Sequence, residues 1–221
     1  RFKYDVRTGK QAGTGVIAGL SQVEAASDTS IDYKAALKET SVAIEKKLTT
    51  YKVEVADETG GTSVVDWYGP ANASIGGEWA VIGESRYGRK NVLWYRAYYE
   101  NLVRVLQAAG EAQASADGTT TGGSAKTVPL KLDSRKGTEN SRAILALTAM
   151  GIDASNVEGY DLTAALSDMT YVKKQGLNGP IWALIALDSG NYEIPQITSG
   201  KTTAQVSREK LLSYILSSEL T

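Results

Sequence analysis

Three apolar segments, each ended by a glycine, dominate the hydrophobic pattern of this chain. They are GGEWAVIGESRYG, ending at Gly88, NSRAILALTAMG, ending at Gly151, and NGPIWALIALDSG, ending at Gly190. Each carries little charge, and a terminal glycine supplies the left-handed backbone conformation on which many helices end. The pattern predicts three buried helices of one design, at about residues 78–87, 140–150 and 180–188.

Other segments place apolar residues on one helical face only. This spacing predicts an amphipathic helix at about residues 31–51, with Asp28, Thr29 or Ser30 as its N-cap. It also predicts helices at 92–109 and 205–220 and a short helical turn at 161–168. Apolar helices suit an inner ring that amphipathic helices cover. We therefore predict an all-α fold of toroid-like helical hairpins, a partial α/α toroid, over residues 31–221.

Three segments lack helical periodicity. Residues 1–30 contain scattered glycines and predict a linker or an irregular N-terminal segment. The stretch VEVADETGGTSVVDWYGP, near residues 52–68, has the alternation and the turn of a short β-hairpin, although an extended loop also fits. The Gly, Ser and Thr content of residues 111–137 predicts a flexible insertion.

The composition excludes several kinds of chemistry. The chain has no Cys and no His, which removes disulfides, thiolate nucleophiles and the commonest general base and metal ligand. With 24 basic and 25 acidic side chains, its net charge of -1 gives no reason to expect nucleic-acid binding. No run approaches the ~20 apolar residues that span a bilayer, so we expect no membrane insertion. The first residues, RFKYDVRTGK, contain no signal-peptide core and begin without Met, which indicates a processed or excised piece.

The three glycine-ended segments, taken in order with GIDASNVEGYDL and NYEIP, resemble bacterial extracellular members of the terpenoid cyclase and protein prenyltransferase superfamily. The similarity covers about residues 74–195 and implies an α/α toroid in a secreted or cell-surface protein, beside Ig-like, S-layer-type or transcobalamin-like modules. In that family an Asp-Gly-Gly-Trp turn and further hairpins usually follow the final helix, whereas this chain stops at Thr221. The resemblance therefore implies the N-terminal half of a toroid, completed by a C-terminal half or covered by a second copy.

The reactive residues of that superfamily do not occur in this sequence. Protein prenyltransferases hold zinc with Asp, Cys and His, and the thioester proteins of the superfamily need a reactive Cys. Class II cyclases use an Asp-x-Asp-Asp proton donor, and no such run occurs here. We therefore expect no catalytic residues, no cofactor and no metal, since a fold does not carry its reaction with it.

Six residues are candidate cavity or ligand contacts. The aromatic candidates could form a stacking platform for sugars, although aromatic residues at helical spacing also fill cores. Glu78 could line a cavity, or its charge could simply interact favourably with a helix N-terminus. Asp188 lies near a helix C-terminus, where the helix dipole disfavours a negative charge. It could hold a cation or a loop there, or cap the following turn. These candidates are Glu78, Trp79, Trp94, Tyr98, Trp182 and Asp188.

Two functional hypotheses follow. The first is a noncatalytic ligand-binding or structural module that holds a glycan, a corrinoid or neighbouring surface-protein domains; the corrinoid is suggested only by the transcobalamin relatives of the fold. The second is a carbohydrate-active enzyme in which Glu78, Asp66 or Asp188 pair across a cavity. The first is favoured, because the sequence has no paired-carboxylate motif and no His.

Overall fold

The computed structural model describes residues 3–5, 10–12, 32–47, 51–56, 60–67, 75–88, 92–116, 129–197 and 204–218. The chain divides into two units, Arg1–Ala36 and Leu37–Thr221. Most of the predicted linker at 1–30 lies outside the described residues. Its described part is an antiparallel strand pair, β1 (Lys3–Asp5) and β2 (Lys10–Ala12).

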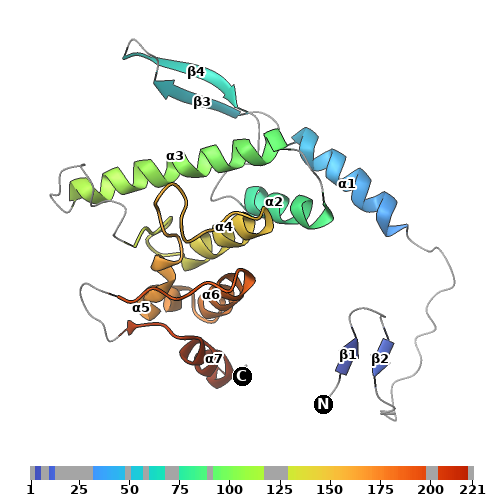
Figure 1. Ribbon diagram of the computed structural model, residues 1–221, viewed down its shortest axis with the longest axis vertical. Coiled ribbons are helices and arrows are strands. Elements are labelled where there is room, and N and C mark those ends of the chain that lie inside the picture. The colour runs from blue at the N-terminus through green and yellow to red at the C-terminus, as the bar shows by residue number, and fades with distance from the viewer. Residues whose placement is uncertain are drawn as a thin grey trace. The chain divides into compact units, whose positions relative to one another are not determined.

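The second unit is predominantly helical, as predicted (Figure 1). The helix α4 (Gly137–Ala149) packs against both α2 (Ile75–Tyr87) and α6 (Asn178–Ser189), so the three apolar segments form neighbouring helices. On the far side of α6 lies α7 (Arg208–Ser217). Three short helices that join α4 to α6 are η1 (Ala164–Ser167), α5 (Met169–Val172) and η2 (Lys173–Gln175). The sequence predicted a helical turn only around η1.

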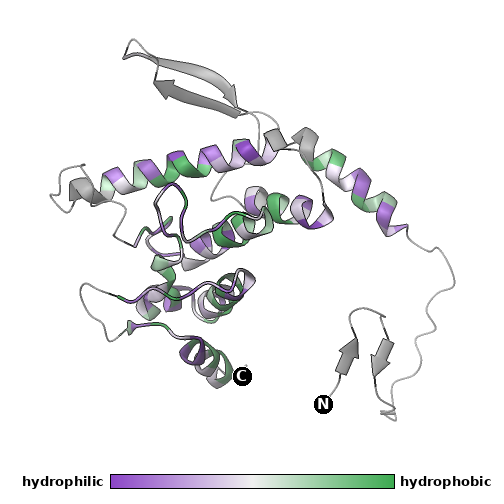
Figure 2. Cartoon of the chain, viewed as in Figure 1, coloured by the Kyte–Doolittle hydropathy of each residue, from purple (hydrophilic) through white to green (hydrophobic). Residues whose placement is uncertain are grey.

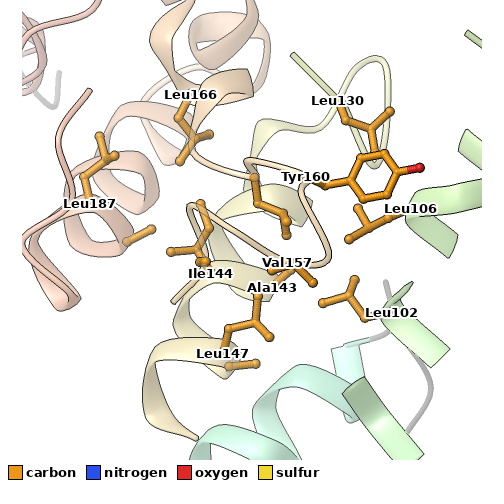
Figure 3. Close-up of a cluster of buried hydrophobic side chains, with 14 of the residues drawn as sticks. Leu102, Leu106, Leu130, Ala143, Ile144, Leu147, Val157, Tyr160, Leu166 and Leu187 are labelled. Atoms are coloured by element: carbon orange, nitrogen blue, oxygen red, sulfur yellow. The ribbon is translucent and has the colours of Figure 1, made fainter. Parts of the chain in front are cut away.

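A long amphipathic helix, α3 (Val92–Ala116), covers the core through one stripe of side chains. Figure 2 shows polar and apolar residues alternating along it. Its buried Leu102 and Leu106 belong to one hydrophobic cluster with Leu130, Ala143 and Tyr160, which come from three other parts of the chain (Figure 3). The helical periodicity that predicted an amphipathic helix here is therefore the pattern that buries α3.

The structure describes the two ends of the insertion predicted at 111–137. The helix α3 continues to Ala116 instead of ending near residue 109. At the other end Leu130 is 3% exposed, and its carbonyl accepts a hydrogen bond from Nδ2 of the buried Asn140 at 2.9 Å. The intervening residues 117–128 lie outside the described part.

The helix α1 (Tyr33–Lys47) is capped by a residue that the sequence analysis did not select. Oδ1 of Asp32 accepts hydrogen bonds from the backbone N–H groups of Lys34 and Ala35, both at 3.0 Å. The predicted caps at 28–30 lie outside the described residues. Further along α1, Ser41 donates a hydrogen bond to Glu84 of α2 at 2.6 Å, which ties the two helices together.

The predicted β-hairpin is confirmed over the alternative of a loop. The strands β3 (Tyr51–Ala56) and β4 (Thr62–Trp67) pair antiparallel, with Tyr51 opposite Trp67 and Val53 opposite Val65. Gly60, between the strands, has a φ of 83°, a left-handed conformation that glycine adopts without steric cost.

The prediction of a left-handed glycine is right for two helix ends and wrong for the third. Gly88 and Gly151 have φ angles of 84° and 79°. Gly190 has a φ of -119°, and the left-handed residue is its neighbour Asn191, with a φ of 51°. Asparagine tolerates this conformation better than most residues, because its short polar side chain bonds locally.

Candidate functional site

Two of the predicted aromatic residues meet on the surface. The ring centroids of Trp79 on α2 and Trp182 on α6 lie 5.3 Å apart at an interplanar angle of 64°, an edge-to-face pair. Trp79 is 39% exposed, and Ile185, three residues beyond Trp182, is 44% exposed. We call this surface of Trp79, Trp182 and Ile185 the tryptophan face.

The positions of these residues within their helices explain why they face outward. Trp79 is preceded by the buried Glu78 and followed by the buried Ala80 and Val81, so it occupies the one exposed position of that turn of α2. Gly83, four residues later, is also exposed, and it leaves the same side of the helix without a side chain. Trp182 and Ile185 share one side of α6 because a spacing of three residues returns to the same face.

A buried charged network lies beside the tryptophan face. Glu78, next in sequence to Trp79, is 1% exposed and accepts a hydrogen bond from the Tyr98 hydroxyl at 3.3 Å. Nε of Arg142, on α4, lies 3.9 Å from Oε2 of Glu78. The same guanidinium donates from Nη2 to Glu139, one turn earlier on α4. The network thus joins α2, α3 and α4.

Burial and charge set the protonation of the tyrosine in this network. Burial raises the pKa of Tyr98 well above its usual value, and the negative charge of Glu78 raises it further. Tyr98 therefore stays a neutral hydrogen-bond donor. Because Glu78 is closed off from solvent and paired with Tyr98 and Arg142, its arrangement is that of a structural ion pair.

The remaining candidates lie apart from these two groups. Trp94 is 4% exposed and packs edge to face on Tyr95, with ring centroids 5.4 Å apart, so it belongs to the core. Oδ1 of Asp188 accepts a hydrogen bond from Nε of Arg208 at 2.7 Å. Nη2 of Arg208 donates to the carbonyls of Leu187 and Tyr192 at 3.3 and 2.9 Å. Asp188 thus holds the arginine that caps the end of α6.

The sequence analysis missed Arg142 and Glu139. Both lie within the first two turns of α4, at the start of an apolar segment, and a charged pair at that place is a usable sign of a buried partner. Asp66 is known only by its place in β4, opposite Lys52 of β3. Within the described ranges, no group of three or more His, Cys, Asp or Glu residues could hold a metal ion. No described helix is both long enough and apolar enough to cross a bilayer.

The chain matches no protein-family model, no curated protein and no solved structure. The resemblance to toroid domains of the terpenoid cyclase and prenyltransferase superfamily therefore stays a prediction.

Proposed function

We propose that this chain is a noncatalytic, toroid-like module of a secreted or cell-surface bacterial protein, and that its tryptophan face binds a glycan. The observation that carries the proposal is the edge-to-face pair of Trp79 and Trp182, which are adjacent on the surface although they come from different helices. The neighbouring order of α2, α4 and α6 supports the toroid part, because consecutive apolar helices of an inner ring lie side by side.

The chemistry of the aromatic pair favours a sugar as ligand. An indole ring offers a large rigid surface with little conformational entropy to lose, and the apolar C–H face of a sugar packs on such a surface. Ile185 extends the apolar area along α6. A large aromatic ring left partly in water is also the kind of group that dominates binding energy when a ligand covers it.

The state of Glu78 argues against the enzymatic alternative. A glycosidase needs two carboxyl groups that reach the scissile bond of the substrate. Glu78 is buried and engaged by Tyr98 and Arg142, and the Asp188 carboxylate is bound to Arg208. Neither acid is arranged to transfer a proton to a sugar.

The test is a titration of the 221-residue chain with a panel of neutral oligosaccharides, followed by calorimetry. We expect Trp79→Ala and Trp182→Ala each to weaken the Kd about tenfold or more, since truncated aromatic contacts at binding sites typically lose at least that much. Leu216→Ala, which removes an exposed apolar side chain on α7, serves as the matched control and should leave the Kd unchanged. Circular dichroism would verify that each variant is folded.

Equal binding by the parent chain and both tryptophan variants would contradict the proposed site. If no oligosaccharide in the panel binds, the glycan assignment fails. The same variants would then be tested for retention of a corrinoid or of neighbouring protein domains.

A further inference from the structure

An open groove of about 880 Å³ lies at the C-terminal ends of α4 and α6. Its described walls come from residue Thr148, from residues between 151 and 163, and from residues 190–196. None of the six candidate residues lines it, and along α6 it lies at the opposite end from Trp182. The volume falls within the range typical of small-molecule sites.

One wall of the groove depends on close packing at Gly190. A Cβ atom at this position would lie 2.4 Å from Cε2 of Tyr192, so the tyrosine ring sits where any other residue would place its side chain. The Tyr192 hydroxyl lies 2.8 Å from Oγ1 of Thr148 and accepts a hydrogen bond from the N–H of Ala154 at 3.2 Å. The ring therefore bridges the ends of the two helices and fixes the shape of the groove.

Two aspartates line the groove with one oxygen engaged each. Oδ1 of Asp153 accepts hydrogen bonds from the N–H and the hydroxyl of Ser155, at 2.9 and 2.7 Å. Oδ1 of Asp161 accepts from the N–H and the hydroxyl of Thr163, at 2.8 and 2.6 Å. The described residues provide no donor for Oδ2 of either aspartate.

The charged side chains in the described lining of the groove are all acidic, and those of Asp153 and Glu193 are exposed to solvent. Glu193 also lines it and has no ion pair or hydrogen bond within the described part of the chain. The described lining contains no Lys or Arg. The C-terminal end of α4 adds partial negative charge, whereas at α6 Arg208 compensates the terminal carbonyls.

We propose that this groove binds an organic cation through an alkylammonium group. An ammonium group donates three hydrogen bonds and accepts none, which complements the described lining, where the charged side chains are all carboxylates. Ile152, Ile194 and Pro195 give the groove an apolar lining for the methylene chain that carries the ammonium group. The ligand is either a free polyamine or the lysine side chain of a peptide. This site is independent of the tryptophan face and of the proposed glycan.

The experiment follows backbone amide resonances of the full 221-residue chain labelled with ¹⁵N. Spermidine and a blocked Gly-Lys-Gly peptide are titrated separately, with 1,8-octanediol as an uncharged probe. We expect saturable shifts at Ser155, Thr163 and Asn191 with an amine, and none with the diol. Saturation by spermidine alone would assign a small amine, and saturation by the peptide alone would assign a lysine side chain.

Charge-removing variants test the carboxylates. Asp153→Asn and Asp161→Asn keep the Oδ1 acceptor that holds the local turn, so they should fold, and each should weaken the Kd about tenfold. Glu39→Gln, on exposed α1, is the matched control and should leave the Kd unchanged. The proposal is overturned if neither amine saturates, if the diol produces the same shifts, or if Glu39→Gln weakens binding as much as the aspartate variants.

Discussion

The helices α4 and α6 end with the same pair of backbone hydrogen bonds but with different residues. At α4, the N–H groups of Ile152 and Gly151 bond to the carbonyls of Leu147 and Thr148, at 2.9 and 3.0 Å. At α6, the N–H groups of Tyr192 and Asn191 bond to those of Leu187 and Asp188, at 2.8 and 3.3 Å. Both ends are Schellman motifs, in which a left-handed residue lets two terminal carbonyls find partners.

The difference shows that glycine has two separate uses at these ends. Gly151 takes the left-handed conformation, and a Cβ there would meet no atom within 4 Å. Gly190 has an ordinary φ, and its lack of a side chain makes room for the Tyr192 ring. The first glycine serves the conformation of the backbone, and the second serves packing at the groove. Substitutions at these positions separate the two roles.

The largest effect is expected for Gly190→Ala. The new methyl group overlaps the Tyr192 ring, so the ring must move and lose its hydrogen bonds, at a cost of about 2 to 3 kcal/mol in the free energy of unfolding. Urea denaturation measures this loss. In a Tyr192→Ala background the same substitution should cost little, because the obstacle is gone. An equal cost in both backgrounds would show that glycine is needed at position 190 for its backbone conformation and not to make room for the Tyr192 ring.

Tyr192→Phe should have the next largest effect. It leaves the ring in place but removes the acceptor for the N–H of the buried Ala154, which should lower the free energy of unfolding by about 1 to 2 kcal/mol. The matched control is Tyr33→Phe, because Tyr33 is mostly exposed on α1. A loss no greater than that of the control would mean that water replaces the hydroxyl.

Gly151→Ala should lower the free energy of unfolding by about 1 kcal/mol, because alanine is strained in the left-handed region although the site has space. Gly151→Asn should lose less, since Asn191 already occupies the equivalent position at α6. Thermal unfolding of both variants would check this order. If alanine and asparagine are tolerated equally, the backbone at this end relaxes out of the left-handed conformation.

The smallest effect is expected for Asn191→Gly. Glycine removes the strain of a left-handed asparagine but gains conformational freedom in the unfolded chain, so the two effects should cancel to within about 0.5 kcal/mol. Chemical denaturation with closely spaced points can resolve a difference of that size. A loss above about 1 kcal/mol would reveal an interaction of the asparagine side chain that these two effects do not include.

The sequence predicted the three apolar helices, the amphipathic α3 and the β3–β4 hairpin, because the signal for each lies within one segment: an apolar run that a glycine ends, a helical period or a strand-like alternation. It misassigned the end of α6, because Gly190 and Asn191 are both suited to the left-handed position, and the glycine instead leaves room for the Tyr192 ring. It missed α5 and η2, which are too short to show a period.

The sites could be predicted only in part, because they depend on contacts between segments that are distant in the sequence. The pairing of Trp79 with Trp182 and that of Glu78 with Arg142 depend on which helices become neighbours, and spacing along the chain does not encode this. The groove is assembled from two polar segments on either side of α6, and each of them has the composition of an ordinary loop. Its walls come together only because α4 and α6 pack with their C-terminal ends at the same place.

Arg208 couples the end of α6 to the start of α7. One guanidinium binds the Asp188 carboxylate and the carbonyls of Leu187 and Tyr192, so α7 cannot leave without freeing the segment that holds the Tyr192 ring. The two segments should therefore open as one cooperative unit, with their slowest amide protons exchanging at a common rate. A partner that binds and stabilises α7 would therefore, through this one side chain, also reduce how often the segment with the Tyr192 ring opens.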